Sequence, residues 1–578
     1  MHGAEKLITE HIRLWTLAIQ KKNGAGRGSS KKIDLYGIKK LRELILELAV
    51  RGKLVPQDPG DEPASVLLER IAAEKARLVK EKKIKKPKKL SEINEEEKPF
   101  ELPNSWEWSR LGLLINLISG QHLKPDEYME NQADGSIPYI TGPAEFGDIF
   151  PSYSKYTYQY RAVAKKGDIL ITCKGAGIGK LNIANEKIAI SRQLMAIQSI
   201  NVSSQFLKLI ASSLYDYFQN KGVGIAIPGI SREDITGTIV GVPPIAEQHR
   251  IVTKVDELMA LCDQLEQQTE ASIAAHSLLV ENLLKTLTHS ADAAELTANW
   301  NRIAEHFTTL FSTEESIDQL KQTILQLAVM GKLSQPIATD SPVTGLLNNI
   351  LDIQNRKASK KELLIIQNEL RKSFINEHDN SVLLKARVFC EFITKGTTPS
   401  KPELMEHSDI PFLKVYNIID NQLDFNYRPI FISKETHNTK LKRSKLFPGD
   451  VIMNIVGPPL GKVAIIGNKY PEWNMNQALA VFRPLGGVFN KYLYYILTAK
   501  NTLGSVLKEV KGTAGQDNLS LEQCRDLLIP LPSVEEQHRI VAKVDELMAF
   551  CDKTKTRLQQ AQQTRLHLAD AMVEEALN

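Results

Sequence analysis

Apolar side chains recur at three- and four-residue intervals in two distant parts of the chain. The first heptad run consists of Ile251, Val255, Leu258, Cys262 and Leu265. The second run consists of Ile540, Val544, Leu547 and Cys551, and is continued by Leu558. This spacing predicts two long amphipathic helices, each with an apolar seam of the coiled-coil kind.

Other patterns predict what precedes each long helix. Apolar residues at helical spacing occupy 38–48 and 317–327, and Gly52 and Gly331 follow where a helix is expected to end. Runs such as DILITCK and KVAIIG instead resemble short strands and are broken by Gly, Pro and Asn. The mixed α/β regions that these runs predict cover residues 100–242 and 381–531.

Much of the chain is written twice. EQHRIVTKVDELMA at 247–260 returns as EQHRIVAKVDELMA at 536–549, and LAVRGKL at 48–54 returns as LAVMGKL at 327–333. Repeats this far apart exceed the unit of a solenoid. They indicate a tandem duplication with roughly 280 residues in each copy. In such a chain, we expect the two seams to pack on each other antiparallel, about a pseudo-two-fold axis.

The predicted fold class is therefore α/β (α+β), with two mixed domains joined by long helices that form an antiparallel coiled coil. Segment 23–32, NGAGRGSSKK, has no counterpart in the second copy and is expected to be a flexible loop. The predicted divisions are an N-terminal helical region with a basic linker at 1–99, a first mixed domain at 100–242, a central helical region at 243–380, a second mixed domain at 381–531 and a C-terminal coiled-coil helix at 532–578.

The composition limits the possible classes of function but does not identify one. The chain of 578 residues is 42% hydrophobic and 24% charged, as folded proteins of several units are. Its net charge of +5 permits a nucleic-acid partner but does not demand one. The five cysteines are scattered without metal-binding spacing, which fits a reduced compartment, and we expect a cytoplasmic protein. No signal peptide is recognised, and no apolar run approaches the roughly 18 residues that span a bilayer.

The glycine-rich string KGAGIGK at 174–180 is the most tempting cofactor motif. A dinucleotide loop must pass from a strand into a helix, whereas KLNIANEKIAIS follows here and reads as another strand. The second copy has VGPPLGK in its place, and neither string has P-loop spacing. We therefore predict a strand–turn–strand, with Lys180 and Lys462 at the turn.

The repeated polar residues of the long helices do not form a catalytic constellation. His249–Arg250 and His538–Arg539 lie in the first helical turns without a nearby nucleophile or paired carboxylate, which favours a structural or partner-contact role. The equivalent seam residues Cys262 and Cys551 are expected to be buried thiols. The basic run at 75–90 predicts a solvated helix face and linker, with phosphate contact as a second interpretation.

Basic clusters at corresponding places in the two mixed regions suit DNA better. YSKYTYQYRAVAKKGD at 153–168 interleaves tyrosines with basic residues, and KLKRSKLFPGD at 440–450 is basic ahead of the same Gly-Asp. Such side chains can position phosphate and read base edges, although ordinary surface lysines explain any single one. Gln193 and Gln477, which align approximately, are candidate base readers. The candidate DNA-binding residues are Lys155, Tyr156, Arg161, Lys165, Lys180, Gln193, Lys440, Lys442, Arg443, Lys445, Lys462 and Gln477.

The twin EQHRIVxKVDELMAxCD and LAVxGKL segments, with LPNSWEWSRLG at 102–112, resemble the specificity subunit of type I restriction–modification enzymes over nearly the whole chain. The N-terminal segment resembles the subgroup with an extended conserved region there. The second copy departs from the pattern, because it lacks an equivalent of Trp106 and Trp108.

The resemblance implies a non-catalytic DNA reader. Each mixed domain would be a target-recognition domain for one half of a bipartite, asymmetric site, and the helices would set the spacer. Two modification (methyltransferase) subunits would dock on the chain, and restriction (translocase/endonuclease) subunits would join through the complex. AdoMet, ATP and Mg are then expected on the partner subunits and not on this chain.

Two other classes stay open from the residues alone. One is a self-contained DNA methyltransferase or nuclease, which the absence of an N-P-P-[FYW] string and of recognisable cofactor loops disfavours. The other is a coiled-coil adaptor that binds only proteins. Failure of the chain and its modification partner to prefer any duplex over random DNA would favour that adaptor.

Overall fold

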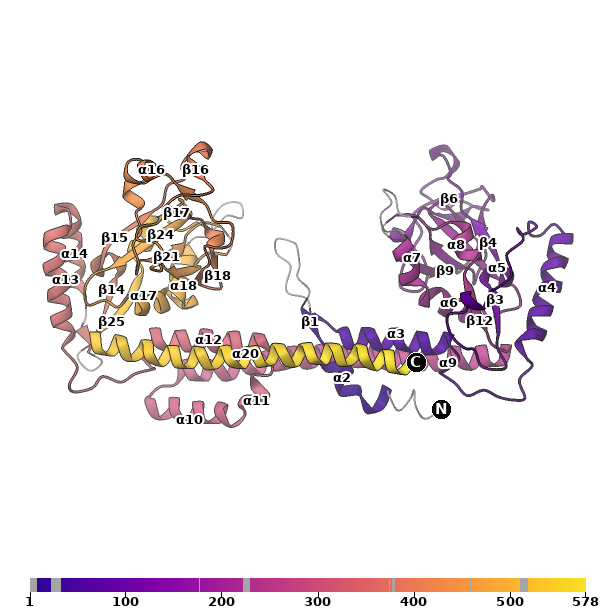
Figure 1. Cartoon of the computed structure of the whole chain (residues 1–578), viewed down its shortest axis with the longest axis horizontal. Coiled ribbons are helices and arrows are strands. Elements are labelled where there is room, and N and C mark those ends of the chain that lie inside the picture. The colour runs from indigo at the N-terminus through magenta and orange to yellow at the C-terminus, as the bar shows by residue number, and fades with distance from the viewer. Residues whose placement is uncertain are drawn as a thin grey trace. The chain divides into compact units, whose positions relative to one another are not determined.

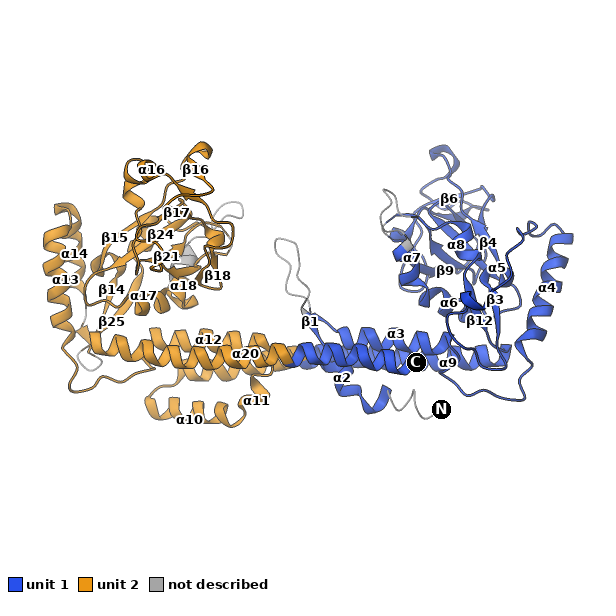
Figure 2. Cartoon of the chain, viewed as in Figure 1, with its two compact units in different colours: residues 1–272, 561–578 blue, residues 273–560 orange. Residues whose placement is uncertain are grey.

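The chain divides into two compact units in the computed structural model. Unit 1 comprises Met1–Ser272 and Ala561–Asn578, and unit 2 comprises Ile273–Gln560 (Figure 2). The structure describes residues 8–21, 33–175, 177–221, 229–373, 375–376, 380–457, 459–509 and 518–577. The predicted loop 23–32 lies outside the described residues. None of the described helices combines the length and the apolar character needed to cross a bilayer.

Unit 1 contains two four-stranded sheets (Figure 1). The first has the order β6 (Tyr156–Thr157), β5 (Ile137–Ile140), β10 (Ile188–Ile190) and β7 (Val163–Ala164). The second has the order β4 (Ile115–Ser119), β11 (Leu194–Ser199), β8 (Ile169–Thr172) and β9 (Leu181–Ile183). Among the described strands of unit 1, only β5 and β10 pair in parallel. A separate antiparallel pair joins β3 (Glu107–Arg110) to β12 (Ile239–Val242).

Burial explains the apolar character of these strands. All four residues of β8 are buried, as expected for a strand with side chains packed on both faces. Leu170 of β8 shares a core cluster with Ile140, Ile190 and Leu194, so the two sheets of unit 1 contribute to one core.

The helices of unit 1 surround this core and begin the long helical segments. Helix α3 buries Ile38, Leu41, Ile45 and Leu48, as the spacing predicts, and Gly52 follows its end with φ +68. A left-handed residue just past the last turn is the usual helix stop, and it favours glycine. The helices are α2 (Ile12–Leu17), α3 (Tyr36–Val50), α4 (Ala64–Lys80), α5 (Leu111–Leu114), α6 (Ser204–Ser213), α7 (Tyr215–Lys221), α8 (Arg232–Thr236) and the first part of α9 (Ile245–His289).

Unit 2 also has two four-stranded sheets. The first matches its counterpart in unit 1 strand for strand, whereas the second shares three strands with its counterpart and has its fourth strand at the opposite edge. One sheet has β15 (Cys390–Lys395), β24 (Leu479–Pro484), β21 (Val451–Asn454) and β22 (Val463–Ile465). The other has β16 (Leu404–Met405), β20 (Phe431–Ile432), β17 (Ile410–Leu413) and β23 (Asn474–Met475), with β17 and β23 parallel. Three further strands are β13 (Ile375–Asn376), β14 (Ser381–Lys385) and β25 (Leu528–Pro532), and a hairpin joins β18 (Ile418–Ile419) to β19 (Gln422–Leu423).

The duplication therefore extends to topology. Strand β14 pairs antiparallel with β25 as β3 pairs with β12, so the second copy has the entry strand even though it lacks the tryptophans. The helices of unit 2 are α10 (Ala293–Glu305), α11 (Phe307–Leu310), α12 (Glu314–Val329), α13 (Val343–Lys357), α14 (Lys360–Lys372), α15 (Ala386–Phe389), α16 (Lys434–Asn438), α17 (Asn490–Thr498), α18 (Lys500–Glu509), α19 (Leu521–Arg525) and most of α20 (Val534–Leu577).

The long helices α9 and α20 each contribute to both units, in opposite order. The last part of α9 belongs to unit 2 with the first part of α20, and unit 1 has the converse parts. In unit 2, a buried cluster joins Ile540, Val544 and Cys551 of α20 to residues of α12 and α9, namely Ile317, Leu320, Ile324, Val280, Leu284 and Leu287. Helices α9 and α20 thus run antiparallel, as predicted, but the expectation that the two seams pack on each other was wrong. The second seam packs on α12 and on residues 280–287 of α9, in a unit that does not contain the first seam.

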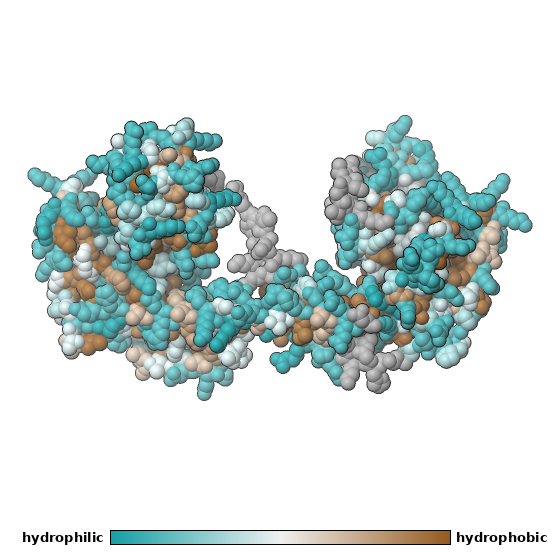
Figure 3. Space-filling model, in the orientation of Figure 1, coloured by the Kyte–Doolittle hydropathy of each residue, from teal (hydrophilic) through white to brown (hydrophobic). Residues whose placement is uncertain are grey.

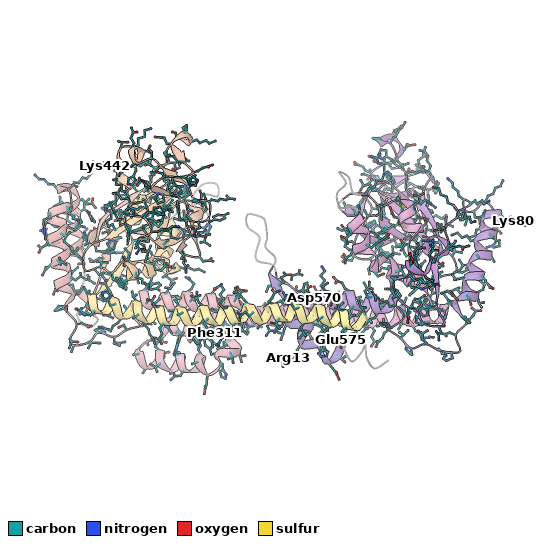
Figure 4. All side chains as sticks on the ribbon, in the orientation of Figure 1. Arg13, Lys80, Phe311, Lys442, Asp570 and Glu575 are labelled. Carbon is teal, nitrogen blue, oxygen red and sulfur yellow. The ribbon has the colours of Figure 1, made fainter. Side chains whose placement is uncertain are left out.

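The equivalent helices of unit 1 are joined by polar contacts at the edge of the first seam. All five residues of that seam are buried. Arg42 of α3 contacts Asp263 at 2.7 Å and Glu266 at 2.9 Å, and Tyr36 donates a hydrogen bond of 2.6 Å to Asp570 of α20 (labelled in Figure 4). Helix α3 is therefore packed with the first half of α9 and the end of α20 in a helical bundle, as α12 is in unit 2.

Candidate nucleic-acid interface

The repeated EQHRIV string makes hydrogen bonds and ion pairs to other parts of its own copy. Glu247 is fully buried, and its Oε1 accepts hydrogen bonds from Trp106 Nε1 at 3.1 Å and Gln57 Nε2 at 2.6 Å. Burial raises the pKa of the Glu247 carboxyl, and these two donors oppose the shift. The helix start is thus bound to the residue just before the β3 entry strand of its own copy and to the segment that follows α3.

The next residue makes the same connection in both copies. Gln248 accepts from the Ser203 backbone N–H at 2.9 Å and donates to the Pro243 carbonyl at 3.0 Å. Gln537 accepts from the Phe489 N–H at 2.9 Å and donates to the Pro532 carbonyl at 3.1 Å. Each glutamine therefore ties its long helix to the segment that starts the domain helix α6 or α17.

The arginine of the string closes a bidentate ion pair. Arg250 contacts the two oxygens of Asp61 at 3.2 and 2.6 Å, and Arg539 contacts those of Asp340 at 2.7 and 2.6 Å. Hydrogen bonding from Arg539 lowers the pKa of the Asp340 carboxyl. The predicted structural role thus applies to Arg250 and Arg539, while the histidines between glutamine and arginine are exposed. The matching bonds of the glutamine and the arginine explain why this string is nearly identical in the two copies.

One end of each domain gathers loops from both sheets. In unit 1, the turn 191–193 passes from β10 in the first sheet to β11 in the second. Its backbone is bonded to neighbouring loops: Ser191 N–H donates to the Ile140 carbonyl at 2.9 Å, and Cys173 N–H donates to the Gln193 carbonyl at 2.8 Å. A Cβ on Gly120 would clash with the Ser191 carbonyl, so the loop after β4 also lies against this turn. We call this surface the loop end.

Unit 2 builds its loop end with equivalent bonds. Asn476 N–H donates to the Leu413 carbonyl at 3.0 Å, and Ile455 N–H donates to the Ala478 carbonyl at 2.9 Å. A Cβ on Gly396 would clash with the carbonyl of Asn476. These bonds pair Gln193 with Ala478, and not with Gln477. The approximate alignment of the two glutamines was therefore wrong by one residue, and the structural counterpart of Gln477 is Arg192.

The predicted lysines of the glycine-rich string lie near the loop end. Strands β8 and β9 pair antiparallel around this string, as β21 and β22 do around its counterpart, so it is the predicted strand–turn–strand. Lys180 is exposed and lines a cleft of about 440 Å³ with Pro143, Ser212 and Tyr215. Lys462 donates to the Ile418 carbonyl at 3.2 Å. Both residues stay candidates for phosphate contact.

The basic cluster of unit 1 is partly engaged within the protein. The Lys155 ammonium lies 5.4 Å from the centroid of the Tyr128 ring, and Arg161 pairs with Glu127 at 2.6 Å. Tyr156 belongs to β6, and Lys165 follows β7 at the end of that strand away from Ala162 and the turn 191–193. The structure therefore does not bring Lys165 together with Lys180 and Gln193 at the loop end.

The basic cluster of unit 2 is similarly divided. Lys440 pairs with Glu403 at 2.6 Å, and hydrogen bonds from Lys440 and Ser400 lower the pKa of the Glu403 carboxyl to about 2. Lys445 lies 2.5 Å from Asn438 and 3.4 Å from Glu472. Lys442, labelled in Figure 4, and Arg443 are exposed and have no ion-pair partner among the described residues. Hydrophilic residues dominate the upper part of the visible face of unit 2 in Figure 3.

Comparison with known proteins gives consistent matches. The family described as type I restriction modification DNA specificity domain matches residues 103–275 and 388–563. The type I restriction enzyme EcoAI specificity subunit of Escherichia coli is 38% identical, with 100% of both chains covered. The EcoEI specificity subunit of the same species is 36% identical, again over 100% of both chains. A crystal structure of the HsdS subunit from Thermoanaerobacter tengcongensis matches with 17% identity and a TM-score of 0.39, covering 83% of this chain and 98% of that one.

Proposed function

The chain belongs to the family of type I restriction–modification DNA specificity subunits, and from this premise we propose how its two copies divide the work. Each target-recognition domain reads one half of a bipartite, asymmetric DNA site. The chain performs recognition and no catalysis. Double-stranded DNA is its ligand, and the loop end of each domain is the surface that contacts the DNA.

This proposal rests on a contrast between the domain framework, which the two copies share, and the loop ends, where their exposed side chains differ. The two domains share the strand order of one sheet, the parallel strand pair of the other sheet and the same anchoring bonds to their helices. At the loop ends, however, the exposed side chains differ, with Arg192 and Lys174 in unit 1 and Gln477 and Val456 in unit 2. Two domains with a shared framework but different exposed side chains suit two different half-sites, because base identity is read by side chains at groove edges.

The partners and cofactors follow from the same family assignment. Two modification (methyltransferase) subunits dock on the duplicated helical surfaces, and restriction subunits join through the complex. AdoMet, ATP and Mg are held by those subunits and not by this chain. The protein works in the cytoplasm, where the DNA lies. Helices α9 and α20, which contribute residues to both units, set the spacer between half-sites.

Methylation mapping of a host genome tests the division of work. The chain is expressed with its modification subunit, and residues 100–242 are exchanged for those of another family member. One half-site is expected to change while the other half-site and the spacer stay constant. A heptad inserted after Leu265 is expected to do the opposite, altering the spacer and neither half-site. Change in both half-sites after the domain exchange would refute independent reading, and an unaltered spacer after the insertion would refute the role of the helices.

A further inference from the structure

The turn that joins the two sheets has the same backbone in both domains but a different side chain at its exposed position. Leu194 N–H bonds back to the Ser191 carbonyl at 2.9 Å, and Leu479 N–H bonds back to the Asn476 carbonyl at 3.2 Å. These closing bonds place Arg192 and Gln477 at the same point, one residue after Ser191 and Asn476. We call this point the apex position.

The apex position stands on a rigid base. Gly120 N–H donates to the Leu194 carbonyl at 3.0 Å, and Gly396 N–H donates to the Leu479 carbonyl at 3.1 Å. Each of these glycines approaches the turn so closely that a Cβ would clash with its backbone. A recognition side chain is most selective when its backbone is fixed by such contacts. The apex side chains are thus held at a defined place while the side chains themselves stay exposed.

The two apex side chains offer different hydrogen-bonding chemistry. The Arg192 guanidinium has no ion-pair or hydrogen-bond partner among the described residues. Gln477 Oε1 accepts a hydrogen bond from the Thr398 hydroxyl, which orients the amide. An amide oxygen accepts two hydrogen bonds, so one acceptor site and both N–H donors of Gln477 remain for a ligand. Arginine matches O6 and N7 of guanine in the major groove, whereas glutamine matches N6 and N7 of adenine.

The neighbours of the apex position differ in the same direction. Lys174 follows Cys173, whose Sγ lies 3.1 Å from the Gln193 carbonyl, and it forms an isolated bridge with Gly229. Val456 forms the equivalent bridge with Asn518 in unit 2 and is 37% exposed. A second cation beside Arg192 favours the acceptor-rich edge of guanine, while the apolar neighbour of Gln477 adds no competing charge.

Building on the function proposed above, we propose that Arg192 and Gln477 are equivalent specificity-determining residues, with Arg192 reading a guanine in the half-site of the first domain and Gln477 reading an adenine in that of the second. The two half-sites then differ at this position because of a single side chain on an otherwise shared turn. A phosphate contact by Arg192 is the competing role, since it would position the DNA without reading it.

The test uses the chain in complex with its modification subunit, with genome methylation motifs as the readout. Arg192→Ala is expected to relax one base of one half-site, with discrimination reduced about 5- to 150-fold, the range for one bidentate pair. Gln477→Ala is expected to relax one base of the other half-site only. Arg192→Lys keeps the charge without the planar fork, so it should also lose discrimination. Lys187→Ala, just before β10 at the end away from the turn, removes one exposed charge and is the matched control.

The outcomes separate the inference from the function on which it rests. Uniformly weaker methylation with an unchanged motif in Arg192→Ala, together with full rescue by Arg192→Lys, would show a phosphate contact and overturn the reading role. An unchanged motif in Gln477→Ala would overturn the equivalence of the two positions. If the unmodified complex yielded no motif, the proposed function would fail as well, whereas a clear motif that the variants leave intact defeats only the inference.

Discussion

In both copies, a buried side chain donates hydrogen bonds to the carbonyl groups at an equivalent short helix, but the side chain differs between the copies. In copy one, the Lys75 ammonium donates to the Ile115 carbonyl at 2.8 Å and to the Gly112 carbonyl at the end of α5. In copy two, the Gln354 amide donates to the Val388 carbonyl at 2.9 Å and the Cys390 carbonyl at 3.0 Å, at the end of α15. Both side chains are buried. A helix end needs donors for its last carbonyls, and either a cation or a neutral amide can provide them.

This contrast shows what duplication has preserved. The glutamine and arginine of the EQHRIV string keep both the residue and the bond. The Lys75/Gln354 position keeps only the bond, and the apex position keeps only the backbone. Side chains that satisfy buried groups are constrained because an unmade bond is costly. An exposed side chain at a loop end has no such constraint from within the fold. The divergence therefore increases from the helix starts toward the loop ends.

The largest expected difference between the copies concerns the seams. Leu258 is 4% exposed, whereas its equivalent Leu547 is half-buried at the edge of its cluster. Leu258→Ala should therefore cost about 2–4 kcal/mol and Leu547→Ala about half as much, since the penalty follows the cavity left behind. Calorimetric unfolding of the whole chain, with hydrogen exchange to assign each loss to a unit, measures both. Equal losses would show that the second seam is as tightly packed as the first.

The ion pairs of the repeated string should behave alike in both copies. Arg250→Ala and Arg539→Ala each leave a nearly buried aspartate, Asp61 or Asp340, without its partner. We expect each change to cost about 2 kcal/mol, less than for a fully buried pair, because the arginines are about one third exposed. The same unfolding and exchange measurements apply. A loss of stability in only one unit would mean that the ion pair of the repeated string stabilises that unit and not the other.

Sequence patterns predicted the helices and the duplication well, and the loop ends poorly. The seam residues and the Ile38–Leu48 face follow helical spacing, which is a local property. The error that paired Gln193 with Gln477 arose because a one-residue shift between copies is decided by hydrogen bonds to distant loops, such as that of Cys173 N–H to Gln193. Arg192 was missed for the same reason. The ion pairs of Arg161 and Lys440 also join residues far apart in sequence, so no local pattern could show that these cations were engaged.

The smallest effect should come from charge at the Lys75/Gln354 position. Burial, and next the charge of Arg232, lower the pKa of Lys75 to about 8 from its ordinary 10.5. The unfolded chain then binds more protons than the folded chain between these two values, so stability rises with pH across that window and is flat below it. Relative to Lys75→Gln, which has no titrating group, the unmodified chain should gain about 1 kcal/mol between pH 8 and pH 9. Denaturant unfolding of both proteins at each pH gives the difference. Gln354→Lys should give unit 2 the same pH dependence. If the unfolding free energies of Lys75→Gln and of the unmodified chain changed in parallel with pH, Lys75 would stay charged throughout.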